Sequence, residues 1–134
     1  MGPTKHDRKV VVITGGASGI GLDTARLLLS TGDYRLALVS RDRTKLEEAQ
    51  KALDPKGDLV SIFPCDLRDS AQIKKTMDRL VQVHSSIYGL VNNAGVYPFG
   101  GIDNTTEQGW DDAMMVNLKA PFLIIQAAAE AMRR

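Results

Sequence analysis

A glycine-rich segment near the start of the chain has the spacing of a phosphate-binding turn. It reads Thr14-Gly15-Gly16-Ala17-Ser18-Gly19-Ile20-Gly21. Glycine lets the backbone turn tightly and approach a ligand closely. If a helix follows such a turn, its free N–H groups and positive end attract a phosphate. The alternative is an ordinary strand-to-helix turn that happens to be rich in glycine, and the flanking segments decide between the two interpretations.

A second candidate site stands at Ser40-Arg41, about 20 residues after Gly21. In a dinucleotide-binding fold this position follows the second strand and contacts the adenine ribose. An acid there binds the 2′-hydroxyl of NAD, whereas a nearby arginine suits the 2′-phosphate of NADP. The pair therefore favours NADP over NAD, and a solvated arginine at a strand end is the alternative. Asp42 follows directly, and we expect it to begin the next helix.

Polar residues also follow two further apolar runs. Asp66-Leu67 comes after the run at 59–65, and Asn92-Asn93-Ala94-Gly95 comes after the run at 87–91. Asparagine tolerates turn conformations, and the glycine would end a strand beside a ligand crevice. Asp66 has a second interpretation, because Asp66 or Asp69 could cap the helix that follows. For the asparagine run, the alternative is a plain turn.

Asn117 lies four residues before Pro121 in the last expected helix. A helical carbonyl normally accepts a hydrogen bond from the N–H four residues later, and proline has no N–H. The Asn117 carbonyl is therefore expected to be free to bind water. An incidental asparagine within a helix is the alternative.

The segments between these residues predict strands that alternate with helices. Continuous apolar runs at 8–14, 35–40, 59–65 and 87–91 are typical of strands buried on both faces of a parallel sheet. Apolar residues at helical spacing predict helices at 22–30, 43–53 and 70–84, and a further helix from a capping box at 104–107 to the chain end. This order predicts an α/β fold with a doubly wound parallel sheet.

Taken together, the motifs resemble the short-chain dehydrogenase/reductase family. The glycine spacing and the Asn-Asn-Ala-Gly run carry the resemblance, which covers residues 9 to about 134. It implies a Rossmann-like sheet with strand order 3-2-1-4, and hydride transfer between a nicotinamide and a carbonyl or alcohol carbon. It also implies that Asp66 accepts a hydrogen bond from the adenine amino group, that Leu67 lends its backbone N–H, and that the Asn117 carbonyl holds a water of a proton relay. The expected cofactor-binding residues are Gly15, Ser18, Gly19, Ile20, Gly21, Ser40, Arg41, Asp66, Leu67, Asn93, Ala94 and Gly95, and the expected catalytic residue is Asn117.

The family's catalytic serine and its Tyr-x-x-x-Lys pair have no counterpart in this chain. Tyr34, Tyr88 and Tyr97 all lack a lysine four residues later. We therefore expect a flexible arm at 1–8 and an incomplete NAD(P)-binding Rossmann domain at 9–134, truncated before its C-terminal half. The alternative function is a non-catalytic nucleotide-binding or dimerising module that forms a homo-oligomer through the last helix. Aromatic and methionine side chains in this region, Trp110, Met114 and Phe122, are expected to pack in the core or between subunits.

The composition of the chain further limits its possible functions and partners. The 17 basic and 16 acidic residues give a net charge of +1, which argues against a nucleic-acid surface. No apolar run approaches the length of a membrane span, and we expect neither a membrane partner nor a metal. The single Cys65 cannot form an internal disulfide, so a reducing, cytoplasmic location is expected and Cys65 is predicted to be buried. His84 is predicted to be a solvated surface residue.

Overall fold

A four-stranded parallel sheet forms the centre of the computed structural model, which describes residues 4–98 and 100–134. The strands are β1 (Lys9–Thr14), β2 (Tyr34–Ser40), β3 (Val60–Pro64) and β4 (Gly89–Asn92), and a short 3-10 turn, η1 (Lys5–Asp7), precedes β1. All neighbouring strands are parallel, in the order β3-β2-β1-β4. The predicted strand order 3-2-1-4 is therefore confirmed, and the predicted strand ends are shifted by one or two residues.

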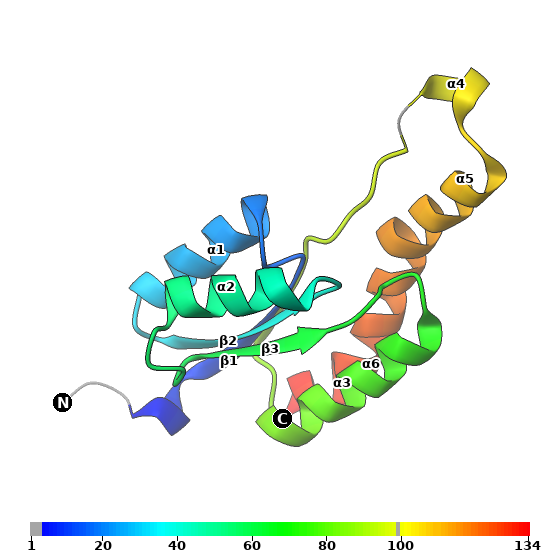
Figure 1. Cartoon of the computed structure of the whole chain (residues 1–134). Helices are drawn as coiled ribbons and strands as arrows, with labels where there is room; N and C mark the ends of the chain where they lie inside the picture. The colour runs from blue at the N-terminus through cyan, green and yellow to red at the C-terminus, as the bar shows by residue number, and fades with distance from the viewer. Residues whose placement is uncertain (1–3, 99) are drawn as a thin grey trace.

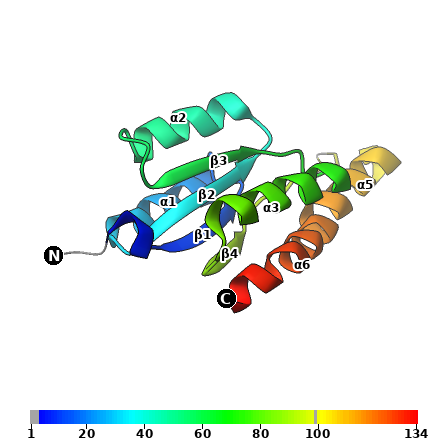
Figure 2. The same ribbon diagram turned by 90° about the horizontal axis from the view of Figure 1, so that it is seen from below.

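Helices cover both faces of the sheet, as Figures 1 and 2 show. On one face lie α1 (Gly19–Ser30) and α2 (Arg43–Leu53); on the other lie α3 (Ser70–His84) and α6 (Ala120–Arg133). The bounds predicted for the helices at 43–53 and 70–84 match the structure. In the part of the chain described here, no helix combines the length and apolar character needed to cross a membrane.

The side chains of the central strands alternate between two hydrophobic clusters. Val11, Ile13, Leu36 and Leu38 pack with α1 and α2, whereas Val12, Ala37 and Val39 pack with α3 and α6. All seven are at most 5% exposed. Full burial of a valine, leucine or isoleucine side chain stabilises a fold by about 1.5–3 kcal/mol. Burial on both faces is the physical reason that these strands appear in the sequence as unbroken apolar runs.

The helix predicted from residue 104 to the chain end is wrong in its start and its continuity. The segment consists of α4 (Gly101–Asn104), α5 (Glu107–Met114), a π turn η2 (Met115–Lys119) and α6. The helix cap is Thr106, because its extended backbone places the side-chain oxygen 3.0 Å from the Gly109 N–H. Asn104 belongs to α4, where its amide donates to the Gly100 carbonyl.

The π turn coincides with the Asn117 region. The Ala120 N–H donates to the Met115 carbonyl, five residues back instead of four. Pro121 has no N–H for Asn117 in the α register, and none for Val116 in the π register. The shift between the two registers therefore lies where the proline removes a donor, and α5 and α6 remain joined through it.

Candidate functional site

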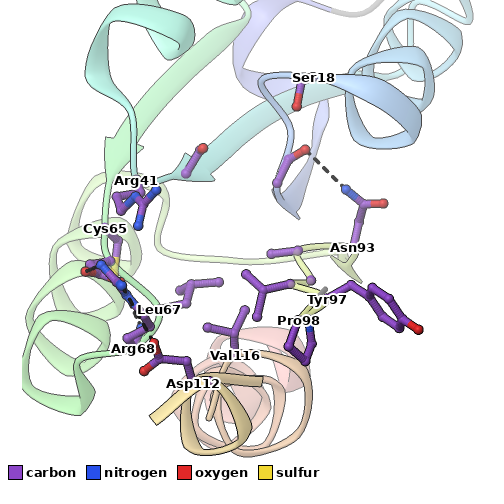
Figure 3. A pocket seen from close by; sticks show the side chains of 17 residues that line it. Ser18, Arg41, Cys65, Leu67, Arg68, Asn93, Tyr97, Pro98, Asp112 and Val116 are labelled. Carbon is purple, nitrogen blue, oxygen red and sulfur yellow. Dashed lines mark hydrogen bonds and ion pairs between the residues drawn. The ribbon is translucent and has the colours of Figure 1, made fainter. Parts of the chain in front are cut away.

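A cavity of about 500 Å³ lies at the carboxyl ends of the strands (Figure 3). The segment that follows each strand contributes to its wall, and α5 and η2 complete it. The lining residues predicted from the sequence are Gly15, Ser18, Ser40, Arg41, Asp66, Leu67, Asn93, Ala94 and Gly95. Those not predicted are Cys65, Arg68, Val96, Tyr97, Pro98, Gly109, Asp112 and Val116. Open parallel sheets bind ligands at this edge, where the chain leaves β1 in one direction and β4 in the other.

The glycine-rich turn is closely packed at Gly15, Gly16 and Gly21, and Gly15 and Gly21 both face Asn93. Gly15 has φ +64°, and a Cβ there would lie 2.9 Å from Asn93 Nδ2. A Cβ at Gly21 would collide with the Gly15 carbonyl oxygen and lie 2.6 Å from the same Asn93 amide. Gly19 differs, because a Cβ there would meet open space while its φ of +53° favours glycine. Gly15 and Gly21 let α1 approach the turn, and Gly19 sets the backbone direction.

The N-terminus of α1 is open to an anion. Ser18 is the N-cap residue and lines the cavity, but its side chain forms no capping hydrogen bond, and the first helical turn contains no acid. The Leu22 N–H donates to the Ser18 carbonyl at 3.2 Å. The backbone N–H groups before Leu22 have no acceptor within the helix. Together with the positive end of the helix, these groups can bind a phosphate. Gly19, Ile20 and Gly21 do not line the cavity, and Ile20 is 78% exposed.

Arg41 is an exposed cation at the wall of the same cavity. Within residues 4–98 and 100–134 it forms no hydrogen bond or ion pair with another side chain. Asp42 does not neutralise it, because Asp42 Oδ1 accepts a hydrogen bond from the Lys45 N–H at 3.1 Å and caps α2. The prediction that Asp42 begins the next helix is confirmed. Ser18 and Ser40 line the cavity as well, so two hydroxyl groups and one guanidinium are available to an anionic ligand.

The aspartates after β3 have separate roles. Asp69 caps α3, and its Oδ1 accepts hydrogen bonds from the Ala71 and Gln72 N–H groups at 2.9 and 3.3 Å. Asp66 instead binds Arg68 and lines the cavity. Hydrogen bonds from the Arg68 side chain lower the pKa of Asp66, against an opposing effect of burial. Asp66 is therefore an ionised acceptor at neutral pH, and the capping alternative for Asp66 is excluded.

Asn93 joins the ends of β1 and β4. Its Nδ2 donates to the Thr14 and Gly15 carbonyls, both at 3.1 Å. The buried Thr14 hydroxyl accepts from the N–H groups of Asn93 and Ala94 at 3.1 and 3.0 Å. The side chain of Asn93 thus shapes the turn that carries Gly15. Its amide group is committed to the protein backbone, and any effect on a ligand would pass through that turn.

Asn117 lies outside the cavity and holds part of its wall. Its Oδ1 accepts from the Val96 N–H at 2.8 Å, and its Nδ2 donates to the Val96 carbonyl at 2.7 Å. Val96 and Tyr97 line the cavity, and Figure 3 labels Tyr97 there. The reciprocal pair fixes the loop after β4 against the π turn. The sequence pattern indicated a role for the Asn117 backbone but gave no signal for this use of its side chain.

Cys65 and His84 are both more buried than typical surface residues. Cys65 is 3% exposed, as predicted, and burial raises the pKa of its thiol, so the group stays protonated at neutral pH. The prediction that His84 is solvated is wrong. Its Nε2 lies 2.9 Å from Ser61 Oγ, and burial lowers its pKa, with a further contribution from the charge of Arg35. Packing against the sheet therefore favours the neutral imidazole.

Known proteins of one family match this chain over nearly all of its length. The family model for short chain dehydrogenases matches residues 9–134. The chain is 35% identical over 124 residues to 2-(S)-hydroxypropyl-CoM dehydrogenase 3 of Xanthobacter autotrophicus, covering 92% of this chain and 48% of that protein. It is 33% identical to sepiapterin reductase of Chlorobaculum tepidum, covering 95% of this chain and 54% of that protein. The chain spans about half the length of these curated relatives.

Two solved structures share the fold described above. A metagenomic short-chain oxidoreductase in complex with NADP superposes with a TM-score of 0.85 at 38% identity, over 92% of this chain and 56% of that one. NADPH-bound carbonyl reductase from chicken fatty liver superposes with a TM-score of 0.83 at 28% identity, over 92% of this chain and 51% of that one. The sheet order, the glycine-rich turn and these matches agree, and the chain belongs to the short-chain dehydrogenase/reductase family.

Proposed function

We propose that this chain is the NADP-binding part of an oxidoreductase that transfers hydride between the nicotinamide and a carbonyl or alcohol carbon. The observation that carries the proposal is that an uncommitted Arg41 and Ser18, the N-cap residue of α1, line the same cavity. A phosphate at the helix and a second phosphate at the arginine would both find unpaired donors. The NADP and NADPH complexes of the two solved relatives support the same ligand.

Each part of the cavity wall suits one part of the dinucleotide. The first N–H groups of α1 would bind the pyrophosphate, and Arg41 with Ser18 and Ser40 would bind the 2′-phosphate. Asp66 and the Leu67 N–H would bind the adenine. Bound nicotinamide supplies or accepts the hydride, while the protein orients it and excludes water. The Asn117 carbonyl, which Pro121 leaves without its α-helical donor, would hold a water for proton transfer.

Arg41 is expected to decide between NADP and NAD. A hydrogen bond to a charged group contributes about 1.5–3 kcal/mol, or roughly one to two decades of affinity. Calorimetric titration of the purified chain should therefore give tighter binding of NADP. Arg41→Asp should reverse or abolish the preference, because it places a negative charge against the phosphate.

Arg43→Asp is the matched control, because it makes the same charge change two residues away. Arg43 does not line the cavity and lies 3.9 Å from Glu47 on the exposed side of α2. Its cofactor preference should equal that of the parent chain. Equal affinities for both cofactors in the parent, with no change in Arg41→Asp, would refute the assignment.

A dimerising module is the second candidate function. Large apolar side chains are exposed along the helical segment from α5 to α6: Trp110, Met114, Leu118, Phe122, Ile125 and Met132, at 39–62% exposure. An exposed apolar surface of this kind is typical of an interaction site. We propose that a second copy of the chain covers it. Phe122→Glu should shift the molar mass from dimer to monomer in light scattering, whereas Leu27→Glu, at an exposed site on α1, should not.

A further inference from the structure

Arg68 lines the cavity and donates three hydrogen bonds to one neighbour, Asp66. Its backbone N–H and Nε donate to Asp66 Oδ1 at 3.0 and 3.1 Å, and its Nη2 donates to Asp66 Oδ2 at 2.9 Å. The guanidinium also reaches α5, where Nη1 lies 3.9 Å from Asp112 Oδ2. Figure 3 shows Arg68 between the loop after β3 and Asp112. The bidentate contact fixes the plane of the Asp66 carboxylate far better than a single bond would.

These contacts leave Asp66 with little acceptor capacity. An ionised carboxylate has about four lone-pair sites and no proton to donate. Arg68 uses two sites on Oδ1 and one on Oδ2, so one site on Oδ2 remains. Asp66 lines the cavity, and the Arg68 hydrogen bonds keep its pKa low, which maintains the ionised form. The cavity therefore presents an oriented acceptor that suits a single N–H donor.

We propose that Arg68 is a positioning residue that makes the site selective for a 6-aminopurine dinucleotide over its 6-oxopurine analogue. The inference rests on the proposed NADP binding and adds the element that selects the base. An exocyclic amino group can donate to the remaining site on Asp66. A 6-oxo group has no proton there and would direct an oxygen at the carboxylate. Arg68 acts through Asp66, because without the guanidinium the carboxylate would lose two hydrogen bonds and its fixed plane, and only the bond from the backbone N–H of residue 68 would remain.

The test compares the dissociation constants of NADP and of its hypoxanthine analogue, deamino-NADP, on the purified chain. The parent should bind NADP more tightly by about tenfold or more, because the ionised Asp66 pairs with the amino group but is repelled by the oxygen of the 6-oxo group. Arg68→Met keeps the long apolar stem and removes the guanidinium, and it should bring the ratio of the two constants close to one. Arg68→Lys keeps the charge but not the bidentate geometry, so its ratio should lie between those of the parent and the Met variant.

Two further variants separate positioning from general destabilisation. Asp66→Asn should lose the discrimination as Arg68→Met does, and the double variant should lose little more, because both changes disrupt one interaction. Arg43→Met, which removes a guanidinium from the exposed face of α2, should leave the ratio unchanged. Circular dichroism and thermal unfolding identify any variant that does not fold. If Arg68→Met is such a variant, the ratio of Arg68→Lys decides.

The outcomes distinguish this inference from the proposed function. If Arg68→Met weakens both dinucleotides by the same factor, Arg68 has only a structural role and the inference is overturned. If the parent binds NADP without preferring the aminopurine, the inference is overturned and NADP binding stands. If the folded parent binds neither dinucleotide, the proposed function is overturned and the inference with it.

Discussion

The reciprocal pair between Asn117 and Val96 makes a quantitative prediction about the cavity wall. Asn117→Ala removes the partners of both the Val96 N–H and the Val96 carbonyl, whose bonds measure 2.8 and 2.7 Å. A typical hydrogen bond contributes about 0.5–1.5 kcal/mol, so two contribute about 1–3 kcal/mol. Val96 is 43% exposed, and water can satisfy much of what is lost. We therefore expect the free energy of unfolding to fall by only about 1 kcal/mol.

The larger effect should be local. With neither bond in place, the loop from Gly95 to Tyr97 loses its attachment to the π turn. Hydrogen exchange at the Val96 amide should accelerate about five- to tenfold, which corresponds to about 1 kcal/mol of local opening free energy. Amides in the middle of β1, such as that of Val12, should exchange as in the parent. The assay is exchange followed residue by residue by NMR.

Asn117→Asp separates the two hydrogen bonds. The carboxylate keeps an acceptor for the Val96 N–H but faces the Val96 carbonyl with an oxygen and no donor. Protection of the Val96 amide should persist in this variant although the loop is destabilised on its carbonyl side. An unchanged exchange rate at Val96 in Asn117→Ala would show that the loop is held by other contacts, and the reasoning would be wrong.

Two further predictions follow from the packing of the sheet. Gly21→Ala places a Cβ against the Gly15 carbonyl and 2.6 Å from Asn93 Nδ2. Chemical denaturation should therefore show a loss of about 1–3 kcal/mol in the free energy of unfolding. The control is Gly32→Ala, which is strained only by its φ of +81° and should leave the glycine-rich turn and its phosphate affinity intact. Burial lowers the pKa of His84 in the folded state, so the neutral imidazole should make its full contribution to the free energy of unfolding above the unfolded pKa of about 6.5. That free energy should decrease as the pH falls from about 6.5 toward the lowered pKa. His84→Gln should flatten this dependence, and an equally steep decrease in the variant would exclude His84 as its source.

The strand order could be predicted from the resemblance to the family, and the strands and much of the cavity could be predicted from local sequence patterns. Strands buried on both faces are apolar at nearly every inner position, so the runs of β1 and β2 are visible without knowledge of their neighbours. The motifs after these strands converge because the carboxyl ends of parallel strands share one edge of the sheet. For the same reason Ser40-Arg41 and Asp66-Leu67, which are distant in sequence, both line the cavity.

Residues that reach the cavity by helix packing carry no comparable signal. The cavity is lined by Gly109, Asp112 and Val116, because α5 and the π turn cross its lower side in the view of Figure 3 while α6 packs on α3. The choice between Asp66 and Asp69 as the helix cap also depended on tertiary structure. Both have the right residue type and position, and the contact of Arg68 with Asp66 distinguishes them.

By itself, the sequence determined the family, the α/β architecture and the glycine-rich turn, because these depend on residues close together in the chain. The start of the last helical segment was misplaced, because Asn104 and Thr106 are both acceptable caps and only the backbone around Thr106 presents its oxygen to Gly109. Tertiary structure alone decided which polar side chains are hydrogen-bonded within the protein and which remain available to a ligand. The side chains of Asn93 and Asn117 are hydrogen-bonded to the backbone of other segments, whereas the Arg41 guanidinium remains available to a ligand. The reason is that hydrogen-bond partners distant in sequence are brought together only when the chain folds.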